Sequence, residues 1–333
     1  MPSGLKIAVV EPTDLIGCEL IKILEERNFP VRDLILLGGK RSIGTNSEFR
    51  GEEIPVKQID GLSFKGVGVV FFVSDKAMSA EFAGHARASG AVAIDLTSRF
   101  ALDESVPLVV PEINAEKIKD HQGIIANPRG ATIQLVLPLV PISREARIKR
   151  IVVSTYQSVS DSGERALNEL TSQVRDLFSF KETLCDAYPH QIAFNALPHV
   201  GAFTHDAYTE EELLIMAETK RIFEDKGLRI CATSVRVPVF YSHGASVNFE
   251  TARKIAPDRI REILGRSKGV KVEDEPASNT YPTPVHAAGS DECLVGRIRQ
   301  DLSFENGIAL WIVCDNIRKG AALNAVQIAE HLL

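Results

Sequence analysis

The sequence lacks the features that mark membrane-spanning or exported chains. No long hydrophobic run interrupts its 333 residues: the apolar stretch 133–142 is ten residues long and contains two prolines, whereas a membrane-spanning helix needs about 20 apolar residues. The N-terminus shows no basic segment followed by a long apolar stretch and a small-residue cleavage site. We therefore expect a cytoplasmic protein without a transmembrane segment.

Strong charge and paired cysteines are also missing. Lys and Arg number 38 against 44 Asp and Glu, a net charge of −6, and no long basic run is present. Little counterion release is then available to drive binding to nucleic acid, so we expect neither nucleic acid nor a membrane as a partner. The five cysteines are widely spaced and include no C-x-x-C pair, which argues against a disulfide framework and against a metal site.

What the chain does contain indicates two domains. Residues 1–128 alternate short apolar strands, such as 92–95, with amphipathic helices, which predicts an α/β, Rossmann-like domain of the NAD(P)-binding type with a parallel sheet. Residues 129–315 contain longer, alternating strands, which favours a second, antiparallel α+β domain for substrate binding and dimerisation. A closing helix within 316–333 is expected to return to the first domain.

Five segments resemble the aspartate-semialdehyde dehydrogenase family, and they follow the family's order across both domains. The segments are VPLVVPEIN at 106–114, TYQSVSDSG at 155–163, SVRVPVFYSH at 234–243, AGSDECLVGRIRQDL at 288–302 and DNIRKGAALNAVQIA at 315–329. The resemblance implies a two-domain homodimer. It also implies an enzyme that reduces aspartyl phosphate to the semialdehyde with NADPH, through a cysteine thioester.

The position of the family's catalytic cysteine carries no thiol in this chain. The family's Asn-Pro-Asn-Cys turn is matched by Asn-Pro-Arg-Gly at 127–130, so the nucleophile position falls on Gly130. Thioester chemistry needs a thiolate, and no cysteine lies between Cys18 and Cys185. A thiol brought close by the fold alone is left open, and a plain helix entry is the interpretation we favour for Gly130.

The phosphate loop after the first strand departs from the family as well. The family's Gly-x-x-Gly-x-x-Gly is matched by Glu11, Asp14 and Gly17, so that two carboxylates replace glycines beside a pyrophosphate. Like charges repel the cofactor. A structural role is the alternative, since Asp14 or its neighbour Thr13 could cap the following helix.

Other cofactor positions are retained. The stretch 39–44 resembles the family's loop for the 2′-phosphate of NADP, with Arg41 and Ser42 as the matching residues. Asn324 matches a family residue near the nicotinamide. Taken with the altered phosphate loop, these positions predict that NADP binds weakly or not at all.

The phosphate end of the family's substrate pocket is missing from this sequence. The Arg and Lys that grip the phosphoryl group fall on Ala101 and Leu214. Arg99, two residues before Ala101, is the one nearby cation that could stand in for them if the stretch is extended.

The amino-acid end of that pocket is retained. Arg236 matches the arginine that binds the substrate carboxylate through a bidentate fork, and Glu211 or its neighbour Glu212 matches the acid that takes the amine. His243 matches the acid/base histidine, and Gln157 matches the glutamine that orients the intermediate. A role outside any binding site is the alternative for three of these positions. The glutamates could be acids at a helix N-terminus, Arg236 could lie on a polar strand face, and His243 could be a loop histidine.

We predict from these departures a non-catalytic paralogue, similar to the usg-type proteins found beside bacterial biosynthetic genes. It would form a homodimer through 129–315 and bind a small carboxylate at Arg236 without NADP. The alternative is an active NADP-dependent aspartate-semialdehyde dehydrogenase, or a related aldehyde oxidoreductase of amino-acid biosynthesis. That enzyme would use a relocated thiol, or His243 as acid/base without a covalent step.

Overall fold

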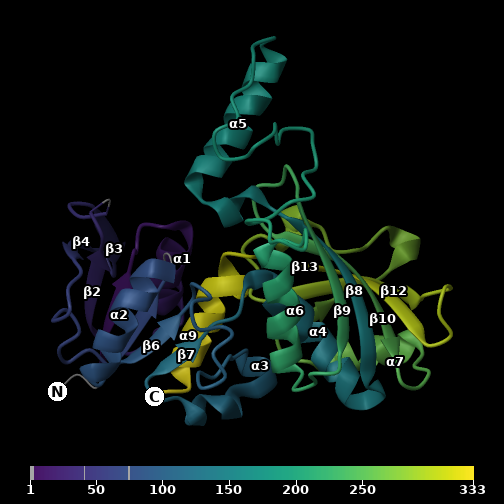
Figure 1. Cartoon of the computed structure of the whole chain (residues 1–333), viewed down its shortest axis with the longest axis horizontal. Helices are drawn as coiled ribbons and strands as arrows, with labels where there is room; N and C mark the ends of the chain where they lie inside the picture. The colour runs from purple at the N-terminus through teal and green to yellow at the C-terminus, as the bar shows by residue number, and fades with distance from the viewer. Residues whose placement is uncertain (1–3, 41, 74–75) are drawn as a thin grey trace. The chain divides into compact units, whose positions relative to one another are not determined.

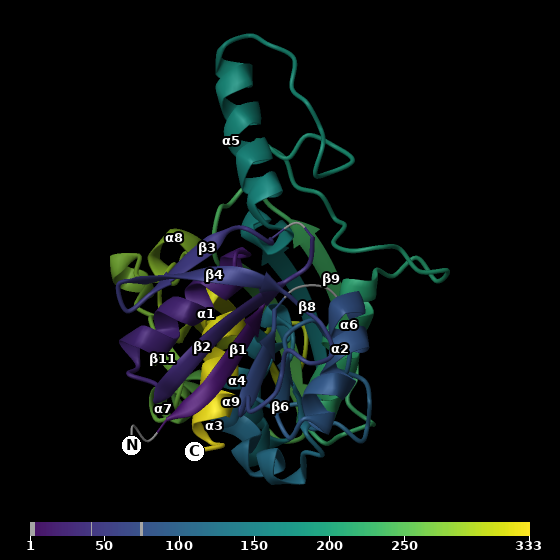
Figure 2. The ribbon, with the colours of Figure 1, turned by 90° about the vertical axis from the view of Figure 1, so that its left-hand side faces the viewer.

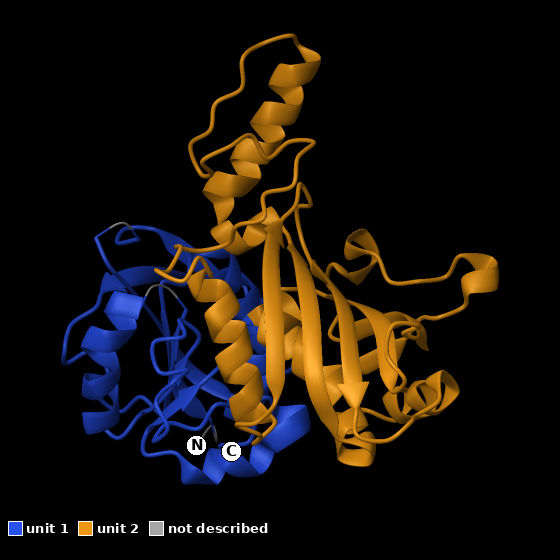
Figure 3. Ribbon diagram, turned by 45° about the vertical axis from the view of Figure 1, so that its right-hand side comes forward, with its two compact units in different colours: residues 1–129, 321–333 blue, residues 130–320 orange. Residues whose placement is uncertain are grey.

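The chain divides into two compact units. The structure, a computed structural model, describes residues 4–40, 42–73 and 76–333. Unit 1 combines 1–129 with 321–333, and unit 2 comprises 130–320 (Figures 1 and 3).

Unit 1 is built on a seven-stranded sheet in the order β3-β4-β2-β1-β5-β6-β7. All neighbouring strands are parallel except β3, which pairs antiparallel with β4. The parallel, helix-connected sheet confirms the predicted Rossmann-like domain. Its elements are β1 (Leu5–Val10), α1 (Leu15–Glu26), β2 (Val31–Gly38), β3 (Asn46–Phe49), β4 (Glu52–Gln58), β5 (Val69–Phe72), α2 (Lys76–Ala88), β6 (Val92–Asp95), α3 (Pro111–Asn114), a 3₁₀-helix at Ala115–Asp120, β7 (Ile124–Ala126) and α9 (Leu323–Glu330).

The C-terminal helix belongs to unit 1, as the sequence predicts. Helix α9 contacts α1, and Figure 2 shows it, in yellow, beside the purple first helix. Ala322 to Ala329 supply buried apolar side chains to the core that contains Ile7 and Leu20. Two hydrogen bonds from the Arg27 guanidinium to the Glu330 carboxylate, at 2.6 and 2.7 Å, join the two helices at the surface.

Unit 2 is built on a six-stranded mixed sheet in the order β11-β12-β13-β10-β8-β9. The inner pairs are antiparallel, as expected for an antiparallel α+β domain, whereas the edge pairs β8–β9 and β11–β12 are parallel. Its elements are α4 (Gly130–Ala146), β8 (Ile148–Gln157), a 3₁₀-helix at Val159–Ser162, α5 (Glu164–Phe178), α6 (Glu210–Ile222), β9 (Arg229–Arg236), β10 (His243–Thr251), α7 (Pro257–Gly265), β11 (Val270–Val272), a 3₁₀-helix at Pro276–Ser278, α8 (Pro284–Ala287), β12 (Cys293–Gln300), β13 (Gly307–Cys314) and a π-helix at Arg318–Ala322.

Helix α4 packs on one face of this sheet. It contacts β8, β10, β12 and β13 as well as α6 and α7, and twelve of its seventeen residues are buried. Alternate residues of β10, among them Ala245, Val247 and Phe249, are buried on that side. Helix α5 projects from the rest of the unit (Figure 1). The strands of this sheet therefore hold Gln157, Arg236 and His243 at their ends.

No helix among the described residues is long and apolar enough to cross a membrane. Within the same ranges, no group of three or more His, Cys, Asp and Glu side chains is placed to hold a metal ion.

Candidate active site

Three side chains predicted for the active site meet where strands of unit 2 end. Gln157 ends β8, Arg236 ends the neighbouring parallel strand β9 in register with it, and His243 begins β10 on the other side of β8. All three are almost fully buried, with exposures of 0%, 3% and 2%. A buried polar side chain needs a partner, and the partners of these residues define the site.

The ring of His243 is held in one orientation. Its Nδ1 accepts a hydrogen bond from the backbone N–H of Ser158 at 3.1 Å, and the Ser158 hydroxyl lies 3.2 Å from the same atom. Because Nδ1 is an acceptor, the neutral ring carries its proton on Nε2. That Nε2 lies 3.9 Å from Oδ1 of Asp161. The side chain is therefore arranged to donate a hydrogen bond from Nε2.

Arg236 already holds a carboxylate of its own chain. Its Nη1 donates to the carbonyl oxygen of Ser158 at 2.6 Å, and its Nη2 donates to Oδ2 of Asp161 at 2.9 Å. The Tyr188 ring lies 5.9 Å from the guanidinium carbon. Burial is the largest cause that raises the pKa of the Tyr188 phenol, so this ring stays neutral beside the cation.

The two candidate glutamates have different surroundings. Glu211 accepts a hydrogen bond from Nε2 of Gln157 at 3.1 Å. Glu212 forms the capping box of α6 with Thr209, and its other oxygen accepts from the backbone N–H of Ser234 at 2.9 Å. Of the two, Glu211 is thus the acid that lies beside the predicted site residues, and Glu212 has a structural role.

Two residues that the sequence did not single out hold this arrangement together. Asp161 contacts both Arg236 and His243. Asn316 Oδ1 accepts from the Ser158 hydroxyl at 3.1 Å and from the backbone N–H of Ser242 at 2.9 Å. Both residues lie within the motifs quoted above, but their partners are distant in sequence, so no local pattern marks them.

Gly130 is the first residue of α4. A Cβ built on it would lie 3.3 Å from the carbonyl oxygen of Gly320 and 3.5 Å from that of Asn316. One turn later, Gln134 anchors the helix on the sheet, because its Nε2 donates to the carbonyl oxygens of His243 and Ile312 at 3.0 and 3.1 Å. Gly130, the predicted nucleophile position, therefore lies at the start of α4 and has no thiol.

Two other thiols lie beside α4. Cys293 and Cys314 are both buried and contact one another, and Cys293 Sγ lies 3.6 Å from the carbonyl oxygen of Gln134. Burial is the largest cause that raises the pKa of the Cys293 thiol well above its usual range. This environment opposes formation of the thiolate that covalent catalysis requires.

In unit 1 the carboxylate of Glu11 occupies hydrogen-bond donors of the loop after β2. Oε1 accepts from the backbone N–H of Gly39 and Oε2 from the hydroxyl of Ser42, both at 2.6 Å. The loop after the second strand of a dinucleotide-binding domain is where the adenosine ribose binds. Gly17 fits such a domain, because a Cβ there would lie 2.7 Å from the carbonyl oxygens of residues 11 and 12. Because Glu11 already accepts from Gly39 and Ser42 and is itself an acid, this loop does not fit a 2′-phosphate.

The other cofactor positions have structural contacts. Asp14 occupies the N-cap position of α1, yet its side chain makes no capping hydrogen bond, so the predicted capping role is wrong. Nδ2 of Asn324 donates to Asn127 Oδ1 at 2.7 Å and to the carbonyl oxygen of Val109 at 3.0 Å, which ties α9 to unit 1. Arg41 lies outside the described residues.

Neither of the two positions predicted for the phosphate grip, both among the described residues, carries a cation. Ala101 and Leu214 are buried apolar side chains. Arg99 is exposed and its guanidinium lies over the Phe100 ring, 5.3 Å from the centroid.

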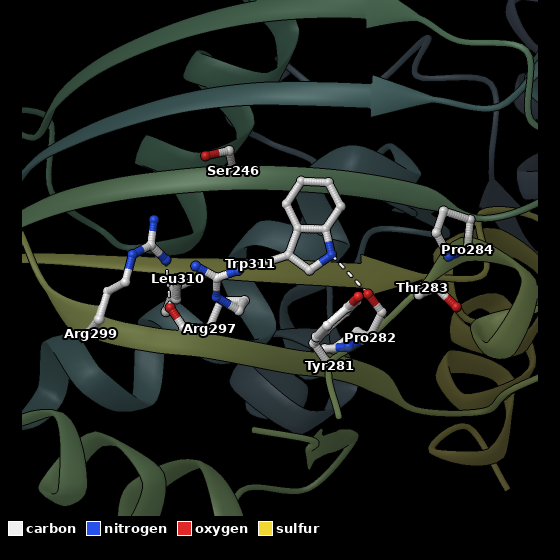
Figure 4. Close-up of a pocket in the computed structure, with 9 residues that line it drawn as sticks. All are labelled: Ser246, Tyr281, Pro282, Thr283, Pro284, Arg297, Arg299, Leu310 and Trp311. Carbon is white, nitrogen blue, oxygen red and sulfur yellow. Dashed lines mark hydrogen bonds between the residues drawn. The ribbon is translucent and has the colours of Figure 1, made fainter. Parts of the chain in front are cut away.

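A hollow of about 350 Å³ lies beside Trp311 of β13 (Figure 4). Tyr281, Arg297 and Arg299 line it, and Trp311 Nε1 donates to the carbonyl oxygen of Pro282 at 3.0 Å. None of the predicted site residues lines this hollow, so it is separate from the cluster around His243.

Comparisons with known proteins define the class. The family model "Semialdehyde dehydrogenase, NAD binding domain" matches residues 6–121, and "Semialdehyde dehydrogenase, dimerisation domain" matches 139–319. The chain therefore belongs to the aspartate-semialdehyde dehydrogenase family. The enzyme named aspartate-semialdehyde dehydrogenase from Aquifex aeolicus is 47% identical over 99% of this chain and 98% of its own. That of Bacillus subtilis is 42% identical over 100% and 98%.

A solved structure agrees over the whole length. Aspartate semialdehyde dehydrogenase II from Vibrio cholerae, in complex with ASA, is 39% identical, has a TM-score of 0.96 and covers 99% of this chain and 98% of its own. The structure of a Candida albicans relative with NADP, at 20% identity and a TM-score of 0.74, supports the fold.

These findings correct the prediction of a non-catalytic, usg-type paralogue. Eight curated relatives, 41–47% identical over nearly the whole chain, are named as aspartate-semialdehyde dehydrogenases. The prediction gave the local losses at Glu11 and Gly130 more weight than the identity of the remaining chain. The alternative, an active enzyme of this family, is the better supported of the two.

Proposed function

We propose that this chain is an active nicotinamide-dependent semialdehyde oxidoreductase. The observation that carries the proposal is the buried cluster of Gln157, Arg236 and His243, in which Nδ1 of His243 accepts from Ser158 and its Nε2–H is left to donate to a substrate oxygen. The full-length identity to enzymes of this name supports the same conclusion.

His243 stabilises developing charge in this proposal. When an aldehyde is reduced, negative charge develops on its oxygen, and the Nε2–H of the neutral His243 ring donates a hydrogen bond to that oxygen. The proton that completes the alcohol comes from water, and in the reverse direction it returns to water. A bound nicotinamide dinucleotide would supply or accept the hydride, so aldehyde, reduced cofactor and a proton would give alcohol and oxidised cofactor without a covalent intermediate.

The phosphate-dependent reaction of the family is the second candidate. Sequence identity to the named dehydrogenases favours it, but it needs a thiol, and Gly130 has none. Cys293 and Cys314 are the thiols beside α4, and the raised pKa of Cys293 opposes their use. The two reactions differ in product, because only the thioester route makes an acyl phosphate.

For the cofactor, we infer NAD rather than NADP. Gly17 supports close packing of the phosphate loop against α1. The carboxylate of Glu11 suits a ribose hydroxyl as a hydrogen-bond acceptor, whereas it takes the donors of Gly39 and Ser42 from a 2′-phosphate. NADP binding is therefore expected to be weak, as predicted from the sequence.

A homodimer through unit 2 remains our proposal for the assembly. The match to a dimerisation domain supports it. So does the pair of Tyr156 and Trp311, whose rings lie 5.5 Å apart and which alternate with the residues buried under α4. A second copy would cover such an aromatic surface. Sedimentation of a monomer at micromolar concentration would contradict the dimer.

The activity is tested with purified protein, L-aspartate semialdehyde and either NAD(H) or NADP(H), with and without phosphate. We expect cofactor-dependent turnover that scales with protein and falls at least about a hundredfold in His243→Ala. His205→Ala is the matched control, because His205 is an exposed histidine. Product analysis separates an alcohol from an acyl phosphate. Absence of turnover with every cofactor would refute the proposal.

A further inference from the structure

The cation that would bind a ligand's carboxylate is already paired with Asp161. Asp161 lies in the short 3₁₀-helix Val159–Ser162 that follows β8, and its Oδ2 accepts from Nη2 of Arg236 at 2.9 Å. The Arg236 side chain is 4% exposed and that of Asp161 is 32% exposed. The cation is therefore held inside the protein, and the acid bound to it belongs to the chain itself.

A ligand carboxylate would have to share the Arg236 cation with Asp161. The second terminal nitrogen of Arg236 donates to the carbonyl oxygen of Ser158 at 2.6 Å. Each terminal nitrogen thus has one partner inside the protein, whereas Nε–H has no hydrogen-bond partner among the described residues. Binding of a second carboxylate would also place two negative charges against one buried cation, which is unfavourable.

The remaining polar groups favour an ammonium group. Gln157 is fully buried, and its Nε2 donates to Glu211. Its Oε1 has no hydrogen-bond partner within the described part of the chain. A buried amide oxygen without a donor is costly, and an ammonium group placed beside it and the Glu211 carboxylate would supply that donor. A charged amine therefore satisfies the site where a carboxylate does not.

We propose that Asp161 is an internal substitute for the ligand's α-carboxylate, and that the site selects aldehydes carrying an ammonium group without that carboxylate. The inference rests on the proposed function for its use of an aldehyde. The placement of Asp161 itself is independent of catalysis. Asp161 is thus the residue that sets specificity at this site, acting through Arg236.

The binding test uses two inert ligands that differ only in the α-carboxylate: L-aspartate and 3-aminopropanoate. Isothermal titration is made on the parent protein, on Asp161→Gly, and on Asp206→Gly as the control at an exposed aspartate. We expect Asp161→Gly to bind L-aspartate at least about tenfold more tightly than the parent, because Arg236 loses its internal carboxylate and can pair with that of the ligand. Its affinity for 3-aminopropanoate should change less than about threefold, and the control should match the parent.

Asp161→Asn provides a second variant of nearly the parent's size. It removes the charge but keeps an acceptor for Arg236, so its gain for L-aspartate should lie between those of the parent and the glycine variant. Thermal melting checks that each variant is folded, and the asparagine variant decides the matter where the glycine variant does not fold. Unchanged L-aspartate affinity in the folded variants would overturn the inference.

Kinetics separate this inference from the proposed function. The parent should use 3-aminopropanal with a higher kcat/KM than L-aspartate semialdehyde, and Asp161→Gly should lower KM for the latter alone. If neither aldehyde reacts while the binding shifts appear, the proposed function fails and the role of Asp161 stands. If both aldehydes react equally in parent and variant and binding is unchanged, the function stands and the role of Asp161 falls.

Discussion

Replacing Glu11 should change which dinucleotide unit 1 binds. In Glu11→Gly, the N–H of Gly39 and the hydroxyl of Ser42 lose the carboxylate that now lies 2.6 Å from each, and both become available to a 2′-phosphate. Two unit charges about 4 Å apart interact by about 4 kcal/mol at an effective dielectric constant near 20. Halving this for the partial exposure of Glu11 leaves roughly 2 kcal/mol, or about thirtyfold in affinity.

Isothermal titration of NADP and NAD against the parent and the variant measures this effect. The ratio of the two affinities isolates the 2′-phosphate, because both cofactors share the pyrophosphate. We expect the ratio to shift toward NADP by about thirtyfold in Glu11→Gly, and by less in Glu11→Gln, whose amide still accepts from Gly39. Asp33→Asn, at an exposed position of β2, is the control. An unchanged ratio in folded Glu11→Gly would refute the reasoning.

Three further outcomes test the packing. A thiol-disulfide reagent at pH 8 should modify only the three exposed cysteines in the native state, because burial raises the pKa of Cys293 and encloses Cys314; five modified thiols without unfolding would contradict this. Gly17→Ala should lower the free energy of unfolding by about 2 kcal/mol through backbone overlap, whereas Gly84→Ala, in open space on α2, should raise it by about 0.5–1 kcal/mol. Thr209→Ala should cost about 1 kcal/mol by removing the capping box of α6, as chemical denaturation would measure.

The sequence predicted the buried parts of the fold because burial leaves a local pattern. The apolar run Val69–Phe72 forms a strand that is buried at every position, as continuous apolar strands in parallel sheets are. The hairpin of β3 and β4 was missed, since Asn46–Phe49 and Glu52–Gln58 are mostly exposed edge strands with few apolar residues. These strands are fixed by pairing, β4 with β2 and β3 with β4, rather than by a pattern of their own.

The site could be predicted only in its composition. Gln157, Arg236 and His243 were identified as site residues, and the strand ends bring them together. Which charge each one faces depends on contacts that a linear sequence does not contain: Asp161 and Arg236 are 75 residues apart, and Glu11 and Ser42 are 31 apart. The prediction placed a ligand's carboxylate at Arg236, whereas the carboxylate that pairs with Arg236 in the structure is that of Asp161.

Two hydrogen-bond donors that match the family's anion-binding positions, Ser42 and Arg236, are each bonded to an acid of this chain. Their presence in the sequence therefore does not by itself indicate anion binding. In unit 1 an acid of the phosphate loop accepts from Ser42, and in unit 2 an acid beyond β8 accepts from Arg236. A hydrogen bond to a charged group contributes about 1.5–3 kcal/mol, so each internal acid competes with an anionic ligand at no cost in translational freedom. We therefore expect Glu11 and Asp161 to govern the affinity for the anionic part of cofactor or substrate. The donors that they hold would decide only where such an anion binds once either acid is removed.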